Sequence, residues 1–100
     1  MPELGAVADA VRSKNAGPFW ITVDVFCGSA AAYDRVRAGL RPDTVAARLG
    51  LAPTALRRFD IDALRVVKLS LPRPVVQGAP ADRDMHGASF AALLAEMEID

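Results

Sequence analysis

The chain begins with a helical pattern of apolar residues that stops at a polar stretch. Four apolar residues recur at the spacing of one helix face: Leu4, Val7, Ala8 and Val11. This pattern predicts a short amphipathic helix. It ends within residues 15–18, because glycine and proline both oppose its continuation. Residues 12–17, Arg-Ser-Lys-Asn-Ala-Gly, are therefore expected to form a polar loop before the next element.

Residues 19–27, FWITVDVFC, are rich in β-branched and aromatic side chains and are almost wholly apolar. That composition predicts a buried central strand, anchored at its start by Phe19 and Trp20. Asp24 is the exception, and a carboxylate in a buried strand should not stay unpaired. We expect it to pair with Lys68 on a neighbouring strand, and a catalytic carboxylate is the alternative.

Two helices are predicted next, over residues 28–40 and 41–50. Ser29 is a candidate N-cap of the first, which has an apolar stripe at Tyr33, Val36 and Leu40. In the second, Val45 and Leu49 form the stripe, Asp43 or Thr44 serves the first turn, and Gly50 ends the helix. Pro53 then opens a further turn.

The second half of the chain predicts two strands, a long irregular segment and a helix. Residues 56–61 read as a short strand, and residues 64–72 alternate, with Val67, Leu69 and Leu71 on one face. Residues 72–87 are irregular, and loops of that length are usually functional or disordered. The closing helix has one apolar face, made of Phe90, Leu93, Leu94 and Met97. For the last five residues, EMEID, a terminal strand is the alternative.

This order of elements places the chain in the α+β class. Adjacent strands mixed with helices favour a ferredoxin-like two-layer sandwich, with the helices on one face of a mostly antiparallel sheet. The length of 100 residues fits a single small domain over residues 1–100. A core of this size often gains stability from association with a partner.

Composition excludes several classes of function. Twelve basic residues balance twelve acidic ones, and no basic stripe runs along the sequence, so we predict no nucleic-acid partner. No signal peptide, basic amphipathic helix or apolar stretch near the ~20 residues of a membrane span is present. We therefore expect no membrane partner and a cytoplasmic location. Cys27 is the only cysteine and His86 the only histidine, which argues against a disulfide and against a cysteine-rich or multi-histidine metal centre. We expect no metal and no cofactor; a metal site made of Asp82, Asp84 and His86 is the alternative.

Two polar segments carry the candidate chemistry. Residues 12–17 combine two cations, a hydroxyl, a carboxamide and a glycine, which suits an anion-binding loop; a plain surface turn is the alternative. In the second segment, Arg73 lies between two prolines, and Asp82, Arg83, Asp84 and His86 crowd one turn. His86 with Asp84 is an acid–base candidate near neutral pH. The alternative is a structural role, in which an aspartate caps the last helix.

Three blocks of the sequence resemble a known family. RSKNAGPFWITVDVF, VKLSLPRPVVQGAPADRDMHGA and LLAEMEI are similar to small bacterial proteins of the domain-of-unknown-function family numbered 4387. The order of an Arg-Ser loop, an apolar strand, PDTVAARL and ALLAEMEI also resembles the C-terminal ferredoxin-like domain of acyclic terpene utilisation (AtuA-type) proteins. In that domain the loop reads Arg-Ser-Gly-Asp-Lys-Gly-Asn, so Arg12 and Ser13 match it directly. Family members tend to be encoded beside a large AtuA-type protein.

The resemblance implies a small subunit of a two-component AtuA-type enzyme. Such systems break down branched or carboxylated acids, often as coenzyme A esters, so we expect a lyase or hydratase acting on a carboxylate or acyl-CoA substrate. The partner would be the large AtuA-type subunit in a hetero-oligomer. We predict His86, Asp84 and Lys14 as catalytic residues. Five residues are predicted to bind the ligand: Arg12, Ser13, Asn15, Gly17 and Arg73. A non-catalytic assembly or regulatory module, or a stand-alone domain that binds a small anion, are the alternatives.

Overall fold

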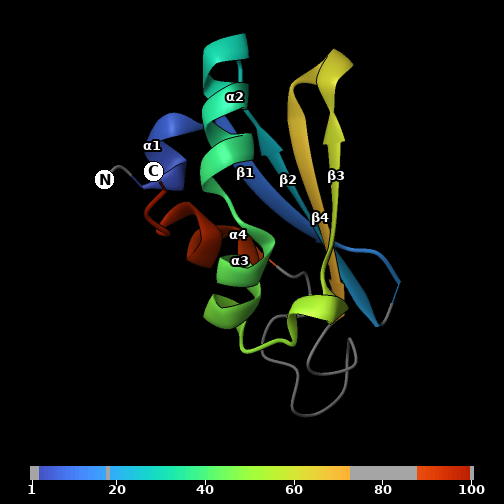
Figure 1. Ribbon diagram of the computed structural model, residues 1–100. Helices are drawn as coiled ribbons and strands as arrows, with labels where there is room; N and C mark the ends of the chain where they lie inside the picture. Colours follow the sequence, from blue (N-terminus) through green and yellow to red (C-terminus); the bar gives the residue numbers. More distant parts are fainter. Residues whose placement is uncertain (1–2, 18, 73–87, 100) are drawn as a thin grey trace.

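The computed structural model describes residues 3–17, 19–72 and 88–99. Within these residues, four strands form one antiparallel sheet in the order β1-β2-β4-β3 (Figure 1). The strands are β1 (Ala10–Asn15), β2 (Trp20–Phe26), β3 (Arg57–Ile61) and β4 (Val66–Pro72).

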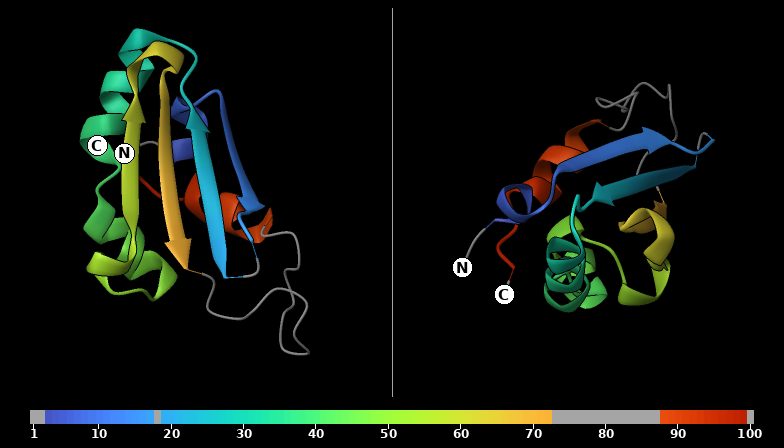
Figure 2. Two further views of the ribbon diagram at one scale, coloured as in Figure 1. Left: turned by 90° about the vertical axis from the view of Figure 1, so that its right-hand side faces the viewer. Right: turned by 90° about the horizontal axis from the view of Figure 1, so that it is seen from above.

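The helices are α1 (Leu4–Val7), α2 (Ala30–Gly39), α3 (Pro42–Leu49) and α4 (Ala88–Ala95). They lie on one face of the sheet and leave the other face uncovered (Figure 2). This two-layer arrangement confirms the α+β prediction. From β2 to α4 the elements follow the ferredoxin-like β-α-β-β-α plan, with the pair α2 and α3 in place of its first helix, and β1 from the N-terminal end occupies the edge beside β2. In the described ranges no helix is both long and apolar enough to pass through a bilayer.

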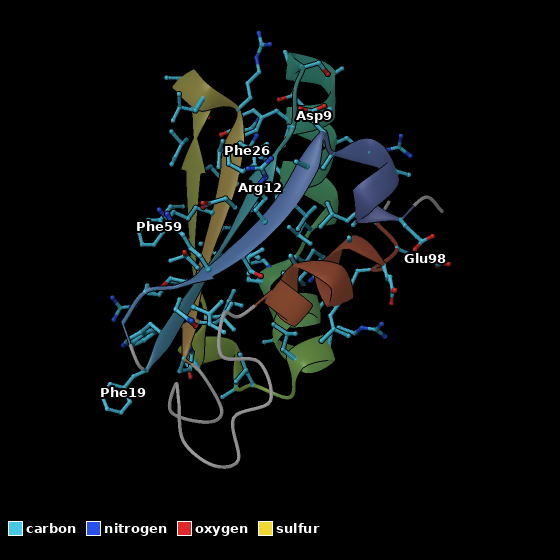
Figure 3. The ribbon with its side chains drawn as sticks, turned by 180° about the vertical axis from the view of Figure 1, so that it is seen from behind. Asp9, Arg12, Phe19, Phe26, Phe59 and Glu98 are labelled. Atoms are coloured by element: carbon cyan, nitrogen blue, oxygen red, sulfur yellow. The ribbon has the colours of Figure 1, made fainter. Side chains whose placement is uncertain are left out.

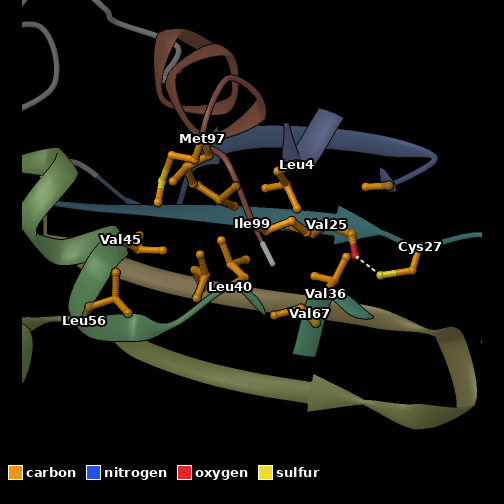
Figure 4. Close-up of a cluster of buried hydrophobic side chains, with 14 of the residues drawn as sticks. Leu4, Val25, Cys27, Val36, Leu40, Val45, Leu56, Val67, Met97 and Ile99 are labelled. Atoms are coloured by element: carbon orange, nitrogen blue, oxygen red, sulfur yellow. Dashed lines mark hydrogen bonds between the residues drawn. The ribbon is translucent and has the colours of Figure 1, made fainter. Parts of the chain in front are cut away.

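The core lies between the sheet and the helices (Figure 4). The two central strands supply a row of fully buried side chains from alternate positions: Ile21, Val23, Val25, Val67, Leu69 and Leu71. From the helical layer, Val36, Leu40 and Val45 pack against this row with no exposed surface. The two ends of the described chain close the layer, because the Leu4 amide donates to the Met97 carbonyl at 2.7 Å.

Several local predictions from the sequence are confirmed. The Ser29 hydroxyl accepts a hydrogen bond from the Ala32 amide at 3.1 Å and so caps α2. Gly50 ends α3 with a left-handed φ of 72°, which glycine adopts without steric cost. A short 3₁₀ turn begins at Pro53, as expected. A second such turn, Asp62–Leu64, joins β3 to β4.

The N-terminal helix prediction is wrong beyond its first turn. The helix ends at Val7, and Val11 belongs to β1 rather than to a helix face. The Asp9 amide donates to the Phe26 carbonyl at 2.7 Å, which begins the pairing of β1 with β2. A central strand needs hydrogen-bonded neighbours on both sides, and this requirement overrides a helix of marginal length.

The expectation that residues 19–27 are buried throughout is also wrong. β2 is central in the sheet, but Trp20 and Phe26 are 39% and 37% exposed, and Phe19 is 59% exposed. Trp20 and Phe26 differ from Ile21, Val23 and Val25 because alternate side chains point to the face that no described helix covers, whereas Phe19 lies before the first residue of β2. Toward the C-terminus, Leu94 and Met97 join the core, whereas Leu93 is 40% exposed. The predicted loop beyond Pro72 and the side chain of Phe90 lie outside the described residues.

Candidate functional site on the uncovered sheet face

The polar segment 12–17, expected to be a loop, is for the most part the edge strand β1. Its side chains alternate between the two faces of the sheet. Arg12 and Lys14 lie on the uncovered face, opposite Asp24 and Thr22 of β2. The predicted cluster is therefore divided, and its two cations share the face that is open to a ligand.

Ser13 and Asn15 belong to the other face of β1, beneath α4. The Ser13 hydroxyl accepts a hydrogen bond from the Ala91 amide in the first part of α4, at 3.1 Å. This bond ties the first part of α4 to β1. Gly17 lies in the turn between β1 and β2 with φ of 81°, and a Cβ there would meet no atom within 4 Å. The turn conformation, rather than a close approach to another group, explains this glycine.

Charge is unevenly distributed between the faces of the sheet. The pairing register places four cations on the uncovered face, Arg12, Lys14, Arg57 and Lys68, against the single carboxylate of Asp24. The chain as a whole has no net charge. Folding therefore gathers positive charge on a surface that the linear sequence does not reveal, and a basic surface of this kind attracts anions.

Three aromatic rings are exposed on the same face. Trp20 and Phe26 stand at the two ends of β2, and Phe59 of β3 is 51% exposed. Figure 3 labels Phe26 and Phe59. Exposed aromatic rings beside cations are typical of surfaces that bind a partner or a ligand rather than water alone. The sequence predicted the strands but not this patch, which only the strand register assembles.

Asp24 sits in the middle of this face without the expected salt bridge. The register confirms that Lys68 lies directly opposite Asp24, with Arg12 on its other side. In the described part of the chain, however, no hydrogen bond or ion pair joins Asp24 to either cation, and its Oδ1 atom is buried without a partner. The Thr22 hydroxyl, two residues away, is in the same state. Both oxygens retain unused hydrogen-bonding capacity.

Two adjoining hollows lie along β1. One, of about 290 Å³, is lined by Arg12, Ser13, Lys14, Asp24 and Phe26. The other, of about 270 Å³, is lined by Asp9, Ala10, Arg12 and Phe26. Because they share Arg12 and Phe26, we treat them as one surface feature, the β1 groove, and Figure 3 shows these two side chains close together on the sheet. The groove offers a planar guanidinium, a point charge, an aromatic wall and carboxylate acceptors.

A larger hollow on the helical side is a weaker candidate. It measures about 620 Å³ and lies between α3 and the C-terminal segment. Its charged residues are Arg48, Glu96 and Glu98, so the cation faces two carboxylates, and no aromatic ring lines it. The β1 groove instead has two cations, Arg12 and Lys14, against two carboxylates, Asp9 and Asp24, and an aromatic ring beside them, which is the better match to an organic anion.

Two other potentially reactive side chains in the described part of the chain, Cys27 and Tyr33, have structural roles. Burial raises the pKa of the Cys27 thiol, which donates to the Val25 carbonyl, so the nucleophilic thiolate is disfavoured. Burial, together with the hydrogen bond from its hydroxyl to Asp62 at 2.5 Å, raises the pKa of Tyr33 to about 12. Within residues 3–17, 19–72 and 88–99, no three His, Cys, Asp or Glu side chains form a group that could hold a metal ion.

The second predicted cluster cannot be placed beside the first. Arg73, Asp84 and His86 lie outside the described residues, as do Asp82 and Arg83. Of the predicted site residues, the structure brings Arg12 and Lys14 together on one face and adds Phe26, which the sequence suggested only as part of a buried strand. The alternation of β1 was the signal that could have separated Ser13 and Asn15 from the two cations.

The fold and groove define a small ferredoxin-like α+β domain with a bare, basic and aromatic sheet face. Comparison with family models matches a domain of unknown function, DUF4387, over residues 4–98. The chain belongs to this family. No curated protein and no solved structure matches the chain.

Proposed function

We propose that this protein is the small subunit of a two-component AtuA-type enzyme, a lyase or hydratase that acts on a carboxylate or acyl-CoA substrate. The observation that carries the proposal is the pair Arg12 and Lys14, which line the β1 groove beside Phe26 on an uncovered sheet face. Guanidinium and ammonium groups are the side chains that bind carboxylate and phosphate in proteins. In this proposal the subunit supplies the anion-binding part of the active site.

The uncovered face also supports the association with a large subunit. Domains of this size commonly complete their burial against a partner, and aromatic residues are enriched where they do so. Trp20 and Phe59 lie outside the β1 groove on the same face. They would contact the large AtuA-type subunit while the groove remains open to the substrate. His86 and Asp84 stay predictions for the acid–base step.

Reconstitution with a large AtuA-type protein tests this function. The tagged small chain is coexpressed with an AtuA-type protein, and copurification and turnover of acyl-CoA and carboxylate substrates are measured. Arg12→Gln and Lys14→Ala should each lower kcat/KM by about tenfold or more, the scale of one lost charged hydrogen bond, and leave the complex intact. Arg48→Gln on α3 is the charge-matched control and should retain full activity. Failure to copurify, or unchanged turnover in both groove variants, would refute the proposal.

A non-catalytic assembly module is the second candidate, and the exposure of Phe59 at 51% is the observation that favours it. Such a module would contact its partner through the sheet face and bind no substrate. Phe59→Ser would then abolish copurification while Arg12→Gln left the turnover of the large subunit unchanged. The enzyme-subunit proposal predicts that Arg12→Gln reduces turnover in a complex that still assembles.

A further inference from the structure

We propose that the β1 groove binds the nucleotide portion of a coenzyme A thioester, with a purine base on Phe26 and phosphate groups on Arg12 and Lys14. The inference rests on the proposed function and names the substrate class of that site. It starts from the combination of a bare antiparallel sheet, exposed rings and cations. Flat bases stack on exposed aromatic rings, and guanidinium and ammonium groups bind phosphate.

The strand register sets the order of contacts along the groove. Arg12 and Phe26 are diagonal neighbours on adjacent strands, and the Cα atoms of such a pair are about 7–8 Å apart. Lys14 is the next residue of β1 on the same face. A nucleotide carries its phosphates one sugar away from its base. A base on Phe26 therefore places the phosphates over Arg12 and Lys14, where positive charge is concentrated.

The acceptors at the groove fit the remaining polar groups of a nucleotide. Asp24 lines the groove between the ring and Lys14. Asp9 lines the opposite end beside Phe26. Ribose hydroxyls can donate to Asp24, and an exocyclic amine of the base can donate to Asp9. A bare phosphate or a simple carboxylate would leave both acceptors and the ring unused.

The dimensions of the groove favour one nucleotide over a nucleic-acid strand. Two hollows of about 290 and 270 Å³ that share two residues match a small ligand, since ligand pockets start near ~300 Å³. Phe59 and Arg57 lie on the same face but outside the groove. The chain has no net charge, whereas strand-binding domains are strongly basic.

Calorimetric titration of the full chain, without the large subunit, tests the inference. The probes are coenzyme A, ADP, adenosine, inorganic pyrophosphate and a single-stranded RNA oligonucleotide. Coenzyme A and ADP should bind with similar affinity, and adenosine and pyrophosphate each at least tenfold more weakly. Trp20 is the only tryptophan and lies diagonally from Lys14 on the same face, so its fluorescence reports phosphate binding independently.

Matched substitutions separate the groove from the rest of the face. Phe26→Leu and Arg12→Gln should weaken coenzyme A binding by about tenfold, the loss of roughly one stacked base or one charged contact. Phe59→Leu and Arg57→Gln change the same residue types on the same face and should leave binding unchanged. Far-ultraviolet circular dichroism confirms that each variant is folded.

Four outcomes would overturn the inference: no nucleotide binding, equal binding of pyrophosphate and ADP, tighter binding of RNA than of ADP, or equal losses in Phe26→Leu and Phe59→Leu. ADP binding much tighter than coenzyme A would overturn the thioester as its source. These results are separable from the proposed function, because the isolated chain is titrated. A complex that turns over a carboxylate substrate without nucleotide affinity refutes this inference alone.

Discussion

Two neighbouring polar residues of β1 should have different roles: replacing Ser13 with alanine should lower stability, and replacing Lys14 with alanine should lower anion binding. Ser13 faces α4 and its hydroxyl accepts from the Ala91 amide at 3.1 Å in a partly buried bond, whereas Lys14 is exposed in the groove. Ser13→Ala removes this hydrogen bond between β1 and α4, a change that costs about 1 kcal/mol. Lys14→Ala removes no such bond and should change stability by less than about 0.5 kcal/mol.

Thermal and urea denaturation, followed by circular dichroism, measure the difference. For a domain of this size, about 1 kcal/mol corresponds to a decrease in Tm of roughly 4–8 °C, which is expected for Ser13→Ala alone. Ser13→Thr keeps the hydroxyl and is the conservative control. Anion binding should follow the reverse order, being lost in Lys14→Ala and kept in Ser13→Ala. If Ser13→Ala is as stable as the native chain, or if Lys14→Ala is the less stable variant, the assignment of faces on β1 is incorrect.

Three further predictions concern the framework behind the face. The Arg58 guanidinium donates to the Leu40 carbonyl at 2.7 Å and to the Arg37 carbonyl at 2.8 Å. Arg58→Met should therefore lower the free energy of unfolding, measured by urea denaturation, by about 2 kcal/mol. If Arg58→Met lowers it no more than Arg57→Met does, these two hydrogen bonds do not stabilise the domain. Tyr33, the only tyrosine, should ionise near pH 12 in an ultraviolet absorbance titration of the folded chain rather than near the usual ~10. Because its pKa is raised in the folded state, its contribution to stability is present below about pH 10 and is lost as the pH rises toward 12, and Tyr33→Phe should remove that pH-dependent loss. The Cys27 thiol, 3% exposed and with a raised pKa, should react with a disulfide reagent only as fast as the chain unfolds, and rapid labelling under native conditions would show that the core opens there.

The sequence predicted those elements whose own residues decide their structure. The alternation around Leu69, the Ser29 cap and the left-handed Gly50 each depend on contacts within a few positions, and each is confirmed. The sequence did not predict β1 because Val11 is its only residue with a high strand propensity. The strand forms by pairing with β2, which follows it after a turn. Propensity is a weak guide where hydrogen bonding to a neighbouring strand decides the outcome.

The candidate site was predicted in its cations but not in its arrangement. Arg12 and Lys14 stand out in the sequence because they are close together, yet their separation from Ser13 by strand alternation depends on the fold. Phe26 could not be recognised, since an apolar run gives no sign of which face a helix layer will cover. The row from Arg12 through Asp24 to Lys68 joins residues from three strands, of which β4 is far from the other two in the chain.

The uncovered face is costly for the isolated domain, and that cost supports a function for it. Buried polar atoms of Thr22 and Asp24 without partners, and exposed rings at Phe26 and Phe59, each oppose stability or solubility in a chain with a small core. Apolar side chains at positions 22 and 24 and polar ones at 26 and 59 would satisfy folding better. Residues that oppose folding in this way are expected to lie together on one surface when binding, rather than folding, determines which residues occur there. A ligand or partner that covers the rings would remove that part of the cost on binding, which couples occupation of this face to the stability of the domain.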